Sequence, residues 1–219
     1  MCANTIEIDE NIQDIKAPET IVMLGAPGSG KDTQANYLVE ALGYQIISTG
    51  DLMRILAGHN DEVHNMIEKG ELISDSVVED ELLSAFVLLP EGQPVILDGY
   101  PRNIDQAHKL NNILGENGRK LDRVIYLSVP DDALITRIEK RRVCKDCGFS
   151  QIGGTKCNSC GGKIDIRKDD KPESVKNRLK IFHDSTEPMI EYFREEGRLV
   201  EIDGRPVPEV VRDSIKKAL

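Results

Sequence analysis

Short apolar runs recur along the chain and predict the strands of a buried parallel sheet. Residues 20–25 read Thr-Ile-Val-Met-Leu-Gly, an apolar run that ends in glycine. A run without polar alternation is typical of a strand that is buried on both faces. The same pattern predicts four further strands, at residues 44–48, 94–98, 124–129 and 199–203.

Helical patterns fill the intervals between these runs. Apolar residues repeat at helical spacing over residues 33–42, and a helix that begins at Ser74 and Asp75 ends before Pro90. Because strands alternate with helices, we predict an α/β fold: a doubly wound five-stranded parallel sheet flanked by helices, with ligands at the carboxyl ends of the strands. The remaining helices are expected over residues 104–114, 131–142, 172–193 with a break at Pro188, and 208–219.

Two stretches depart from the alternation. Residues 51–74 are polar and helical in pattern, and residues 142–167 hold four cysteines among few apolar residues. We interpret both as inserts on one rigid core.

A phosphate-binding loop follows the first strand. Residues 25–31 match G-x-x-x-x-G-K between a strand and a helix, the context that gives this motif its meaning. Backbone N–H groups around Gly28 and Gly30, the helix dipole and the charge of Lys31 would converge on phosphate oxygens. The alternative is an ordinary glycine-rich turn, which the flanking strand and the lysine disfavour. The motif expects Ser or Thr directly after the lysine, whereas here Asp32 precedes Thr33.

Other residues fit the same chemistry. Planar arginines that bind phosphate bidentately are the expected equipment of phosphoryl transfer. Asp98, at the carboxyl end of a predicted strand, suits a hold on Mg²⁺ through water. Taken one at a time, these residues also fit a turn-capping aspartate and solvated surface arginines.

Four of the five cysteines form two Cys-x-x-Cys turns, each followed by glycine. Two such turns complete a tetrahedral thiolate site, and a site closed by four protein ligands is structural. We therefore predict zinc bound by the clustered cysteines and leave Cys2 outside the site; reduced thiols or iron are the alternatives. The predicted ligands are Cys144, Cys147, Cys157 and Cys160.

From residue 20 onward the chain resembles the adenylate kinase family, whose loop reads Gly-x-Pro-Gly-x-Gly-Lys-Gly-Thr; Asp32 stands where that family has glycine. The resemblance implies a P-loop kinase core at residues 20–219 that contains a nucleoside monophosphate (NMP) binding insert at 49–78 and a zinc lid at 138–178. An acidic tail, residues 1–19, precedes this core. The segment between the cysteine pairs is shorter than in the family's zinc lids.

For the donor, the resemblance implies that the phosphate loop binds ATP, that Arg137 stacks on its adenine and that Arg141 binds its phosphates. The implied ATP-binding set is Gly28, Ser29, Gly30, Lys31, Asp32, Thr33, Arg137 and Arg141.

For the acceptor, the motifs at residues 48–54, 70–73 and 98–106 are similar to the family's AMP-binding segments. Gln106 is expected to read adenine and Arg102 to hold the acceptor phosphate. The implied AMP-binding set is Thr49, Arg54, Glu71, Leu72, Ile73, Gly99, Tyr100, Pro101, Arg102, Gln106, Arg167 and Arg178, and the implied catalytic set is Lys31, Arg102, Arg137, Arg141, Arg167 and Arg178.

The resemblance implies reversible, Mg²⁺-dependent phosphoryl transfer from ATP to AMP. A UMP/CMP kinase is an alternative, because Asn103-x-Asp105 resembles the acceptor loop of those enzymes; Thr49 with Gln106 favours AMP. A second alternative is a nucleotide-sensing interaction module in which Asp32 prevents transfer and the zinc site docks a partner.

The distribution of charge along the chain changes what the net charge implies about anionic partners. The net charge of −10 disfavours nucleic acid as a partner. Residues 137–178, however, carry twelve Lys and Arg against six Asp and Glu, which leaves −16 on the rest of the chain. Positive charge is thus concentrated where two nucleotides would bind. No apolar run reaches the length of a membrane span, about 20 residues, and residues 1–19 lack the basic start and apolar stretch of a secretory signal. We therefore expect a cytoplasmic protein that binds no membrane. A monomer is also expected.

Overall fold

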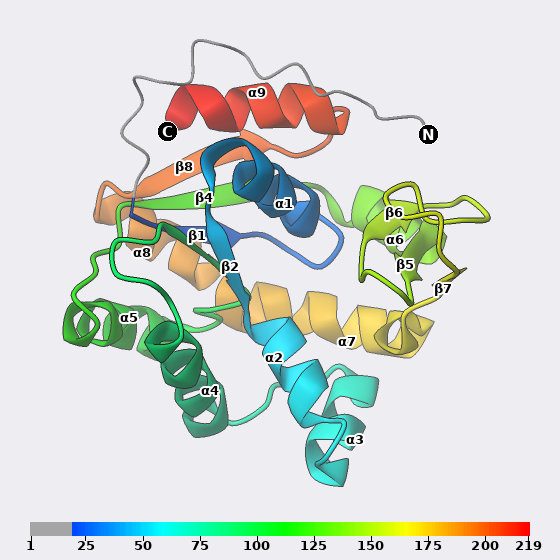
Figure 1. Ribbon diagram of the computed structural model, residues 1–219, viewed down its shortest axis with the longest axis horizontal. Coiled ribbons are helices and arrows are strands. Elements are labelled where there is room, and N and C mark those ends of the chain that lie inside the picture. Colours follow the sequence, from blue (N-terminus) through cyan, green and yellow to red (C-terminus); the bar gives the residue numbers. More distant parts are fainter. Residues whose placement is uncertain (1–18) are drawn as a thin grey trace.

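The computed structural model describes residues 19–219, in which five parallel strands form a central sheet (Figure 1). The strands stand in the order β2-β3-β1-β4-β8, and every neighbouring pair is parallel. The predicted α/β class and the five strands are confirmed. Their bounds are β1 Thr20–Leu24, β2 Gln45–Ser48, β3 Val95–Asp98, β4 Arg123–Ser128 and β8 Leu199–Asp203. Apart from Glu19, the predicted acidic tail lies outside the described residues.

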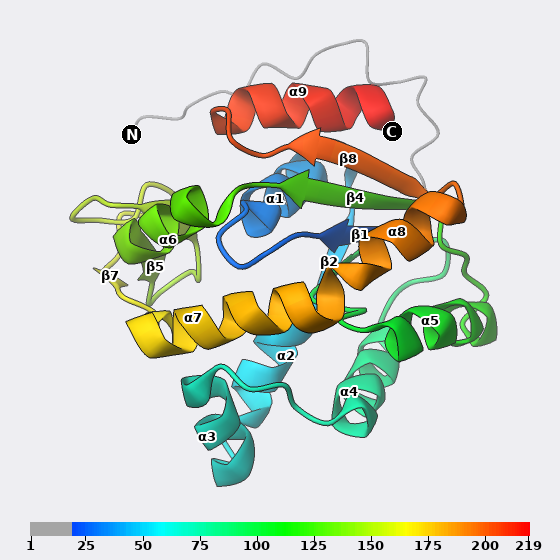
Figure 2. The same cartoon turned by 180° about the vertical axis from the view of Figure 1, so that it is seen from behind.

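Both faces of the sheet are buried because successive side chains of a strand point to opposite sides. Ile21 and Met23 of β1 belong to one apolar cluster, and Val22 and Leu24 belong to the other. The first cluster lies under α1 (Lys31–Leu42) and α9 (Pro208–Ala218). The second is covered by the helices seen in Figure 2, α4 (Asp75–Val87), α5 (Ile104–Glu116), α7 (Pro172–Ile181) and α8 (Pro188–Glu195).

The helix predicted over residues 131–142 is too long by two residues. Helix α6 spans Asp131–Lys140, and Arg141 begins strand β5 (Arg141–Cys144). The chain leaves the helix there because β6 (Ser150–Ile152) and β7 (Ile164–Asp165) pair with β5 on its two sides. This antiparallel sheet, β6-β5-β7, was not predicted.

The polar stretch after β2 folds into α2 (Thr49–Leu56) and α3 (Asp61–Lys69). The predicted long helix near the C-terminus is divided earlier than expected, by a π-helical turn at Phe182–Thr186 between α7 and α8. Figure 1 shows α2 and α3 projecting from one end of the molecule and β5, β6 and β7 lying to one side. Both inserts thus flank the edge of the sheet at which the strands β1, β2 and β3 end.

Candidate functional site

The phosphate loop connects β1 to α1, and Lys31 is held over it. The Lys31 Nζ donates hydrogen bonds to the Gly25 carbonyl at 2.7 Å and to the Ala26 carbonyl at 3.2 Å. Gly28 has φ +84°, and a Cβ added there would lie 2.8 Å from Ile138 Cγ1 of α6. Only glycine fits that position, so the local sequence shapes the loop, within which the Ser29 N–H donates to the Ala26 carbonyl at 3.1 Å.

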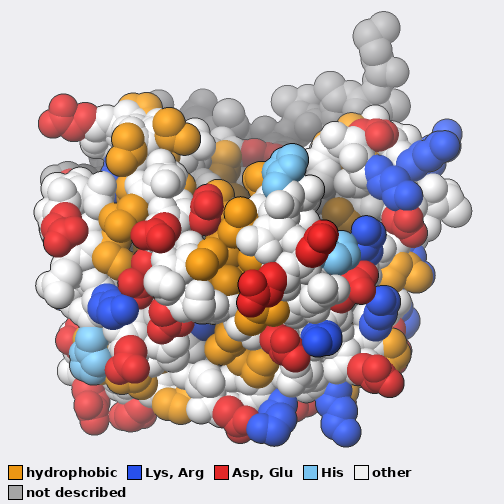
Figure 3. All heavy atoms as spheres, turned by 90° about the horizontal axis from the view of Figure 1, so that it is seen from below, with side chains coloured by type: hydrophobic (Ala, Val, Ile, Leu, Met, Phe, Trp, Pro, Cys, Tyr) orange, Lys and Arg blue, Asp and Glu red, His pale blue; other side chains and the backbone are white. Residues whose placement is uncertain are grey.

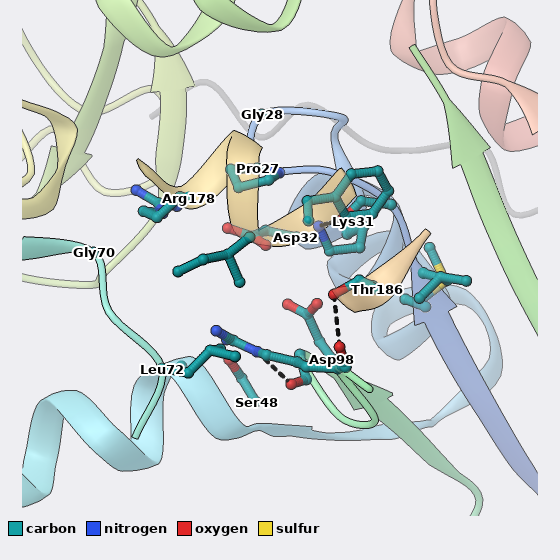
Figure 4. Close-up of a pocket in the computed structure, with 18 of the residues that line it drawn as sticks. Pro27, Gly28, Lys31, Asp32, Ser48, Gly70, Leu72, Asp98, Arg178 and Thr186 are labelled. Atoms are coloured by element: carbon teal, nitrogen blue, oxygen red, sulfur yellow. Dashed lines mark hydrogen bonds between the residues drawn. The ribbon is translucent and has the colours of Figure 1, made fainter. Parts of the chain in front are cut away.

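Two carboxylates face the same cavity as Lys31 (Figure 4). Asp98 ends β3, and burial together with the charge of Asp32 raises its pKa to about 7. Burial also opposes ionisation of Asp32, but the charges of Lys31, Arg167 and Arg141 prevail and its pKa is lowered. The carboxylate oxygens of Asp98 and Asp32 fit the donors that Mg²⁺ prefers when it keeps part of its water shell.

Acidic residues of the lid segment hold three of the predicted arginines. Arg141 binds Asp170 through two hydrogen bonds, of which Nε to Oδ2 measures 2.8 Å. Arg167 Nε donates to Asp169 Oδ1 at 3.2 Å. Arg178 Nη1 lies 3.2 Å from Asp169 Oδ2 and 3.3 Å from Asp170 Oδ1. These carboxylates fix the positions of the three guanidinium groups.

Positive charge remains in excess around the cavity. Burial, with neighbouring arginines, lowers the pKa of Arg178 to about 10. Burial also lowers the pKa of Arg102, whose Nε donates to the Gly99 carbonyl at 2.7 Å. Because the nearby carboxylates do not fully compensate burial, an added anion would be favoured here. The cavity measures about 150 Å³, and its cationic lining consists of Lys31, Arg54, Arg102, Arg141, Arg167 and Arg178.

A second cavity, of about 100 Å³, opens between α2 and the residues before α4. Thr49 is buried and its Oγ1 donates to the Asp98 carbonyl at 3.4 Å. Gly99 has φ +82°, and a Cβ there would lie 2.7 Å from Thr49 Oγ1, so only glycine allows this close approach. The predicted acceptor residues that line the cavity are Thr49, Arg54, Glu71, Leu72, Ile73, Gly99, Arg102, Gln106 and Arg178.

Some predicted residues lie apart from the two cavities. The Arg137 guanidinium donates to the carbonyls of Gly204 at 2.9 Å and Arg205 at 3.0 Å, outside both linings. Thr33 is exposed. Tyr100 is buried and contributes to the apolar core behind the loop. Ser29 is 2 % exposed, and its Oγ has no hydrogen-bond partner among the described residues.

Sequence reasoning missed the acidic residues that orient the arginines and Gln106. Asp169 and Asp170 stand two and three positions after Arg167, which was the available signal. Asp75 accepts a 2.7 Å hydrogen bond from Gln106 Nε2, and only its place at the start of α4 marked it in the sequence.

The four clustered cysteines form a compact group at the ends of the small antiparallel sheet. Their Sγ atoms all lie within 4.8 Å of one another. Cys144 and Cys160 are 3.5 Å apart, and Cys147 and Cys157 are 3.6 Å apart. Zinc–sulfur bonds of about 2.3 Å require tetrahedral sulfur separations of about 3.8 Å, so the group fits this ion.

Each cysteine pair has the same backbone turn. Gly148 N–H donates to the Cys144 carbonyl at 3.1 Å, and Gly161 N–H donates to the Cys157 carbonyl at 2.9 Å. Backbone N–H groups also lower the pKa of Cys157 to about 7, whereas the neighbouring thiols raise the pKa of Cys160. The geometry is therefore compatible with a closed structural zinc site.

A phosphate loop and five arginines arranged around two adjoining cavities, at the carboxyl edge of a parallel sheet, define a P-loop phosphotransferase that handles nucleotides. The model of one family, adenylate kinase, matches residues 23–198. The chain belongs to the adenylate kinase family and is a nucleoside monophosphate kinase, as the sequence predicted.

Several named relatives support this assignment. The adenylate kinase of Lachnospira eligens is 40% identical over 208 residues, which cover 90% of this chain and 98% of the relative. An adenylate kinase of Dehalococcoides mccartyi is 40% identical over 84% of this chain and 90% of its own length. The Halobacterium salinarum adenylate kinase is 37% identical over 91% of this chain and 95% of its own length.

The surface agrees with the uneven charge distribution. Figure 3 shows acidic side chains spread over the face that it presents, while most of the visible Lys and Arg lie on the side where Figure 1 places β5, β6 and β7. None of the helices within residues 19–219 combines the length and the apolar character needed to cross a membrane.

Proposed function

We propose that the protein transfers the terminal phosphoryl group of ATP to AMP, reversibly, with two ADP as products. The observation that carries this proposal is that one cavity joins the phosphate loop to the acceptor-side residues. Arg102 and Arg178 line both cavities, so they stand where the two nucleotides would meet.

In this proposal the donor phosphates bind at the backbone of Gly28 to Gly30 and at Lys31. Arg141 binds the same phosphates, and Arg137 lies beneath the adenine. Asp98 would hold Mg²⁺ through water. The ion supplies neutralisation of the charge on the donor phosphates.

The acceptor would lie in the second cavity, with its base against Gln106 and its phosphate between Arg54 and Arg102. No general base is needed, because the attacking phosphate of AMP is already an anion. Arg102, Arg167 and Arg178 would neutralise the charge that spreads over the transferred group. Their electrostatic stabilisation of that charge is stronger in a site without water.

Carboxylates hold the same guanidinium groups in place. Arg141 pairs with Asp170, which is almost fully buried, and Arg167 pairs with Asp169. Phosphate oxygens would share these guanidinium donors when the lid, residues 138–178, closes over the ATP. Closure excludes water from the site and so prevents hydrolysis of ATP.

The four cysteines would hold a structural zinc ion in this lid. Each Cys-x-x-Cys turn is short, and the ion would join the turn after β5 to the turn before β7. The NMP-binding insert, residues 49–78, would close from the other side of the cavity.

A forward assay with MgATP and a panel of acceptors tests the proposal. We expect kcat/KM for AMP to exceed that for CMP and UMP, since Thr49 and Gln106 line the cavity for the base. A preference for CMP or UMP would instead support a UMP/CMP kinase. Nucleotide binding without transfer to any of the three acceptors would support the sensing module.

A further inference from the structure

The side-chain amide of Gln106 is fixed from two sides. Its Oε1 accepts a hydrogen bond from the Arg102 backbone N–H at 2.6 Å, and its Nε2 donates to Asp75 Oδ1 at 2.7 Å. Gln106 is 4% exposed and lines the second cavity. An ionised carboxylate only accepts hydrogen bonds, and a backbone N–H only donates them. Rotating the amide by half a turn would therefore place Gln106 Oε1 against the Asp75 carboxylate, acceptor against acceptor. It would also place Nε2 against the Arg102 N–H, donor against donor.

Asp75 is itself held by a neighbour. Asn103 caps α5: its Oδ1 accepts from the Gln106 backbone N–H at 2.8 Å. This bond directs Asn103 Nδ2 toward Asp75, where it lies 3.2 Å from Oδ2 and 3.4 Å from Oδ1. Asp75 thus receives donors from both amides, and no other arrangement of the two amides satisfies all of these bonds.

The fixed amide leaves one N–H and one oxygen lone pair of Gln106 unused. Adenine offers an acceptor at N1 beside a donor at its 6-amino group, and this order matches the remaining donor and acceptor. A 6-oxo purine offers the reverse order, a donor at N1 and an acceptor at O6. A glutamine that turned freely could pair with either base, but this one pairs with the amino form alone.

We propose that Asp75 is a positioning residue that makes the acceptor site selective for a 6-amino purine over a 6-oxo purine. This inference rests on the proposed function, because it assumes that Gln106 faces the acceptor base. Cytosine shows the same order of donor and acceptor as adenine, so the device excludes IMP and GMP but does not discriminate against CMP.

An asparagine at position 75 would remove the constraint with little change in shape. Its oxygen would be drawn toward Asn103 Nδ2, so its amide nitrogen would face Gln106 and favour the rotated amide. The Arg102 N–H would still favour the original orientation. Gln106 would then populate both orientations and accept both kinds of purine.

The experiment compares kcat/KM for AMP and for IMP in wild type and in Asp75→Asn. A loss of folded protein lowers both values equally and cancels in their ratio, so a purely structural role would not move it. Because a charge-assisted hydrogen bond is lost, we expect the AMP-to-IMP ratio to fall by about tenfold. Asp80→Asn, the same change at an exposed position of α4, is the matched control and should keep the wild-type ratio.

An unchanged ratio in Asp75→Asn would overturn the inference, as would equal use of AMP and IMP by the wild type. Asp75→Ser provides a second variant if the first does not fold, because a hydroxyl can donate or accept; the same fall in ratio is expected. Failure of the proposed function has a different signature, namely that the wild type phosphorylates neither AMP nor IMP while it binds MgATP.

Discussion

At the scale of single residues, Lys31 carries the largest expected effect. Its ammonium group is held above the phosphate loop by two backbone carbonyls, where charge would develop in the proposed transfer. Replacing it by alanine should lower kcat/KM by about 10²–10³-fold, or about 2.7–4 kcal/mol, the cost of losing one preorganised donor. Steady-state kinetics measure the change, and Lys109→Ala, at an exposed lysine paired with Glu79, should retain activity. Near-wild-type activity of Lys31→Ala would show that the lysine does not contact the transferred group.

Asp32 is the second residue whose effect is predicted. The charges of Lys31, Arg167 and Arg141 lower the pKa of its carboxylate, so it is ionised at neutral pH. A fixed negative charge beside the donor phosphates opposes their binding. Asp32→Gly should lower KM for MgATP by about fivefold, which corresponds to about 1 kcal/mol of repulsion in a partly screened site.

The control for that change is Asp213→Gly, at an exposed position in α9. A rise in KM for MgATP after Asp32→Gly would contradict the prediction and show that the carboxylate assists the bound ion more than it repels the phosphates.

At the scale of elements, the small antiparallel sheet depends on the cysteine cluster. Strands β6 and β7 contain three and two residues, too few for independent stability. Protein purified without chelators should contain about one equivalent of zinc by elemental analysis, and Cys157→Ser should lower both zinc content and thermal stability. Cys2→Ser is the matched control. Zinc content below half an equivalent in the wild type would contradict the tetrathiolate site.

The contact between the π-helical turn and α6 predicts a pH dependence of stability. His183 Nδ1 lies 2.7 Å from Glu187 Oε2, and Nε2 lies 3.1 Å from Asp131. The hydrogen bond to Glu187, together with Asp131, raises the pKa of His183. The stabilisation is therefore complete below the unfolded-state pKa of about 6.5 and is lost as pH rises through the folded-state value.

Urea unfolding of wild type and His183→Asn measures the pH dependence of this stabilisation. The difference in free energy of unfolding should be larger at about pH 6 than at about pH 9, since only protonated His183 gains from the two carboxylates. His59→Asn, at an exposed turn between α2 and α3, is the control. An equal difference at both pH values would sink the prediction.

At the scale of the whole molecule, the sequence predicted the elements whose apolar pattern is set by burial in the core. Strand β1 lies within its predicted range, because burial on both faces leaves a continuous apolar run. The lid sheet left no such signal, since its short strands are held by hydrogen bonds rather than by an apolar face. The phosphate loop and Arg102 were predicted from local motifs. Asp75 and Asp170 were not, because they act on partners 31 and 29 residues away.

The distribution of charge also belongs to the whole molecule. An acidic body and a basic lid segment repel anions in general but attract them to one cleft. The net charge of −10 therefore disfavours a polyanion along the surface and is compatible with two anionic nucleotides in the site. In the structure, five arginines, some of them from the basic lid segment, line the two cavities.

Transfer of a phosphoryl group between two nucleotides is the central claim, and ADP with Mg²⁺ tests it without a second substrate. The reaction is followed by ³¹P NMR on the purified protein, with Lys31→Ala as the comparison. The account predicts that ADP disproportionates into ATP and AMP until the three nucleotides reach equilibrium, and that the variant does so far more slowly. ADP that binds and stays unchanged would contradict it.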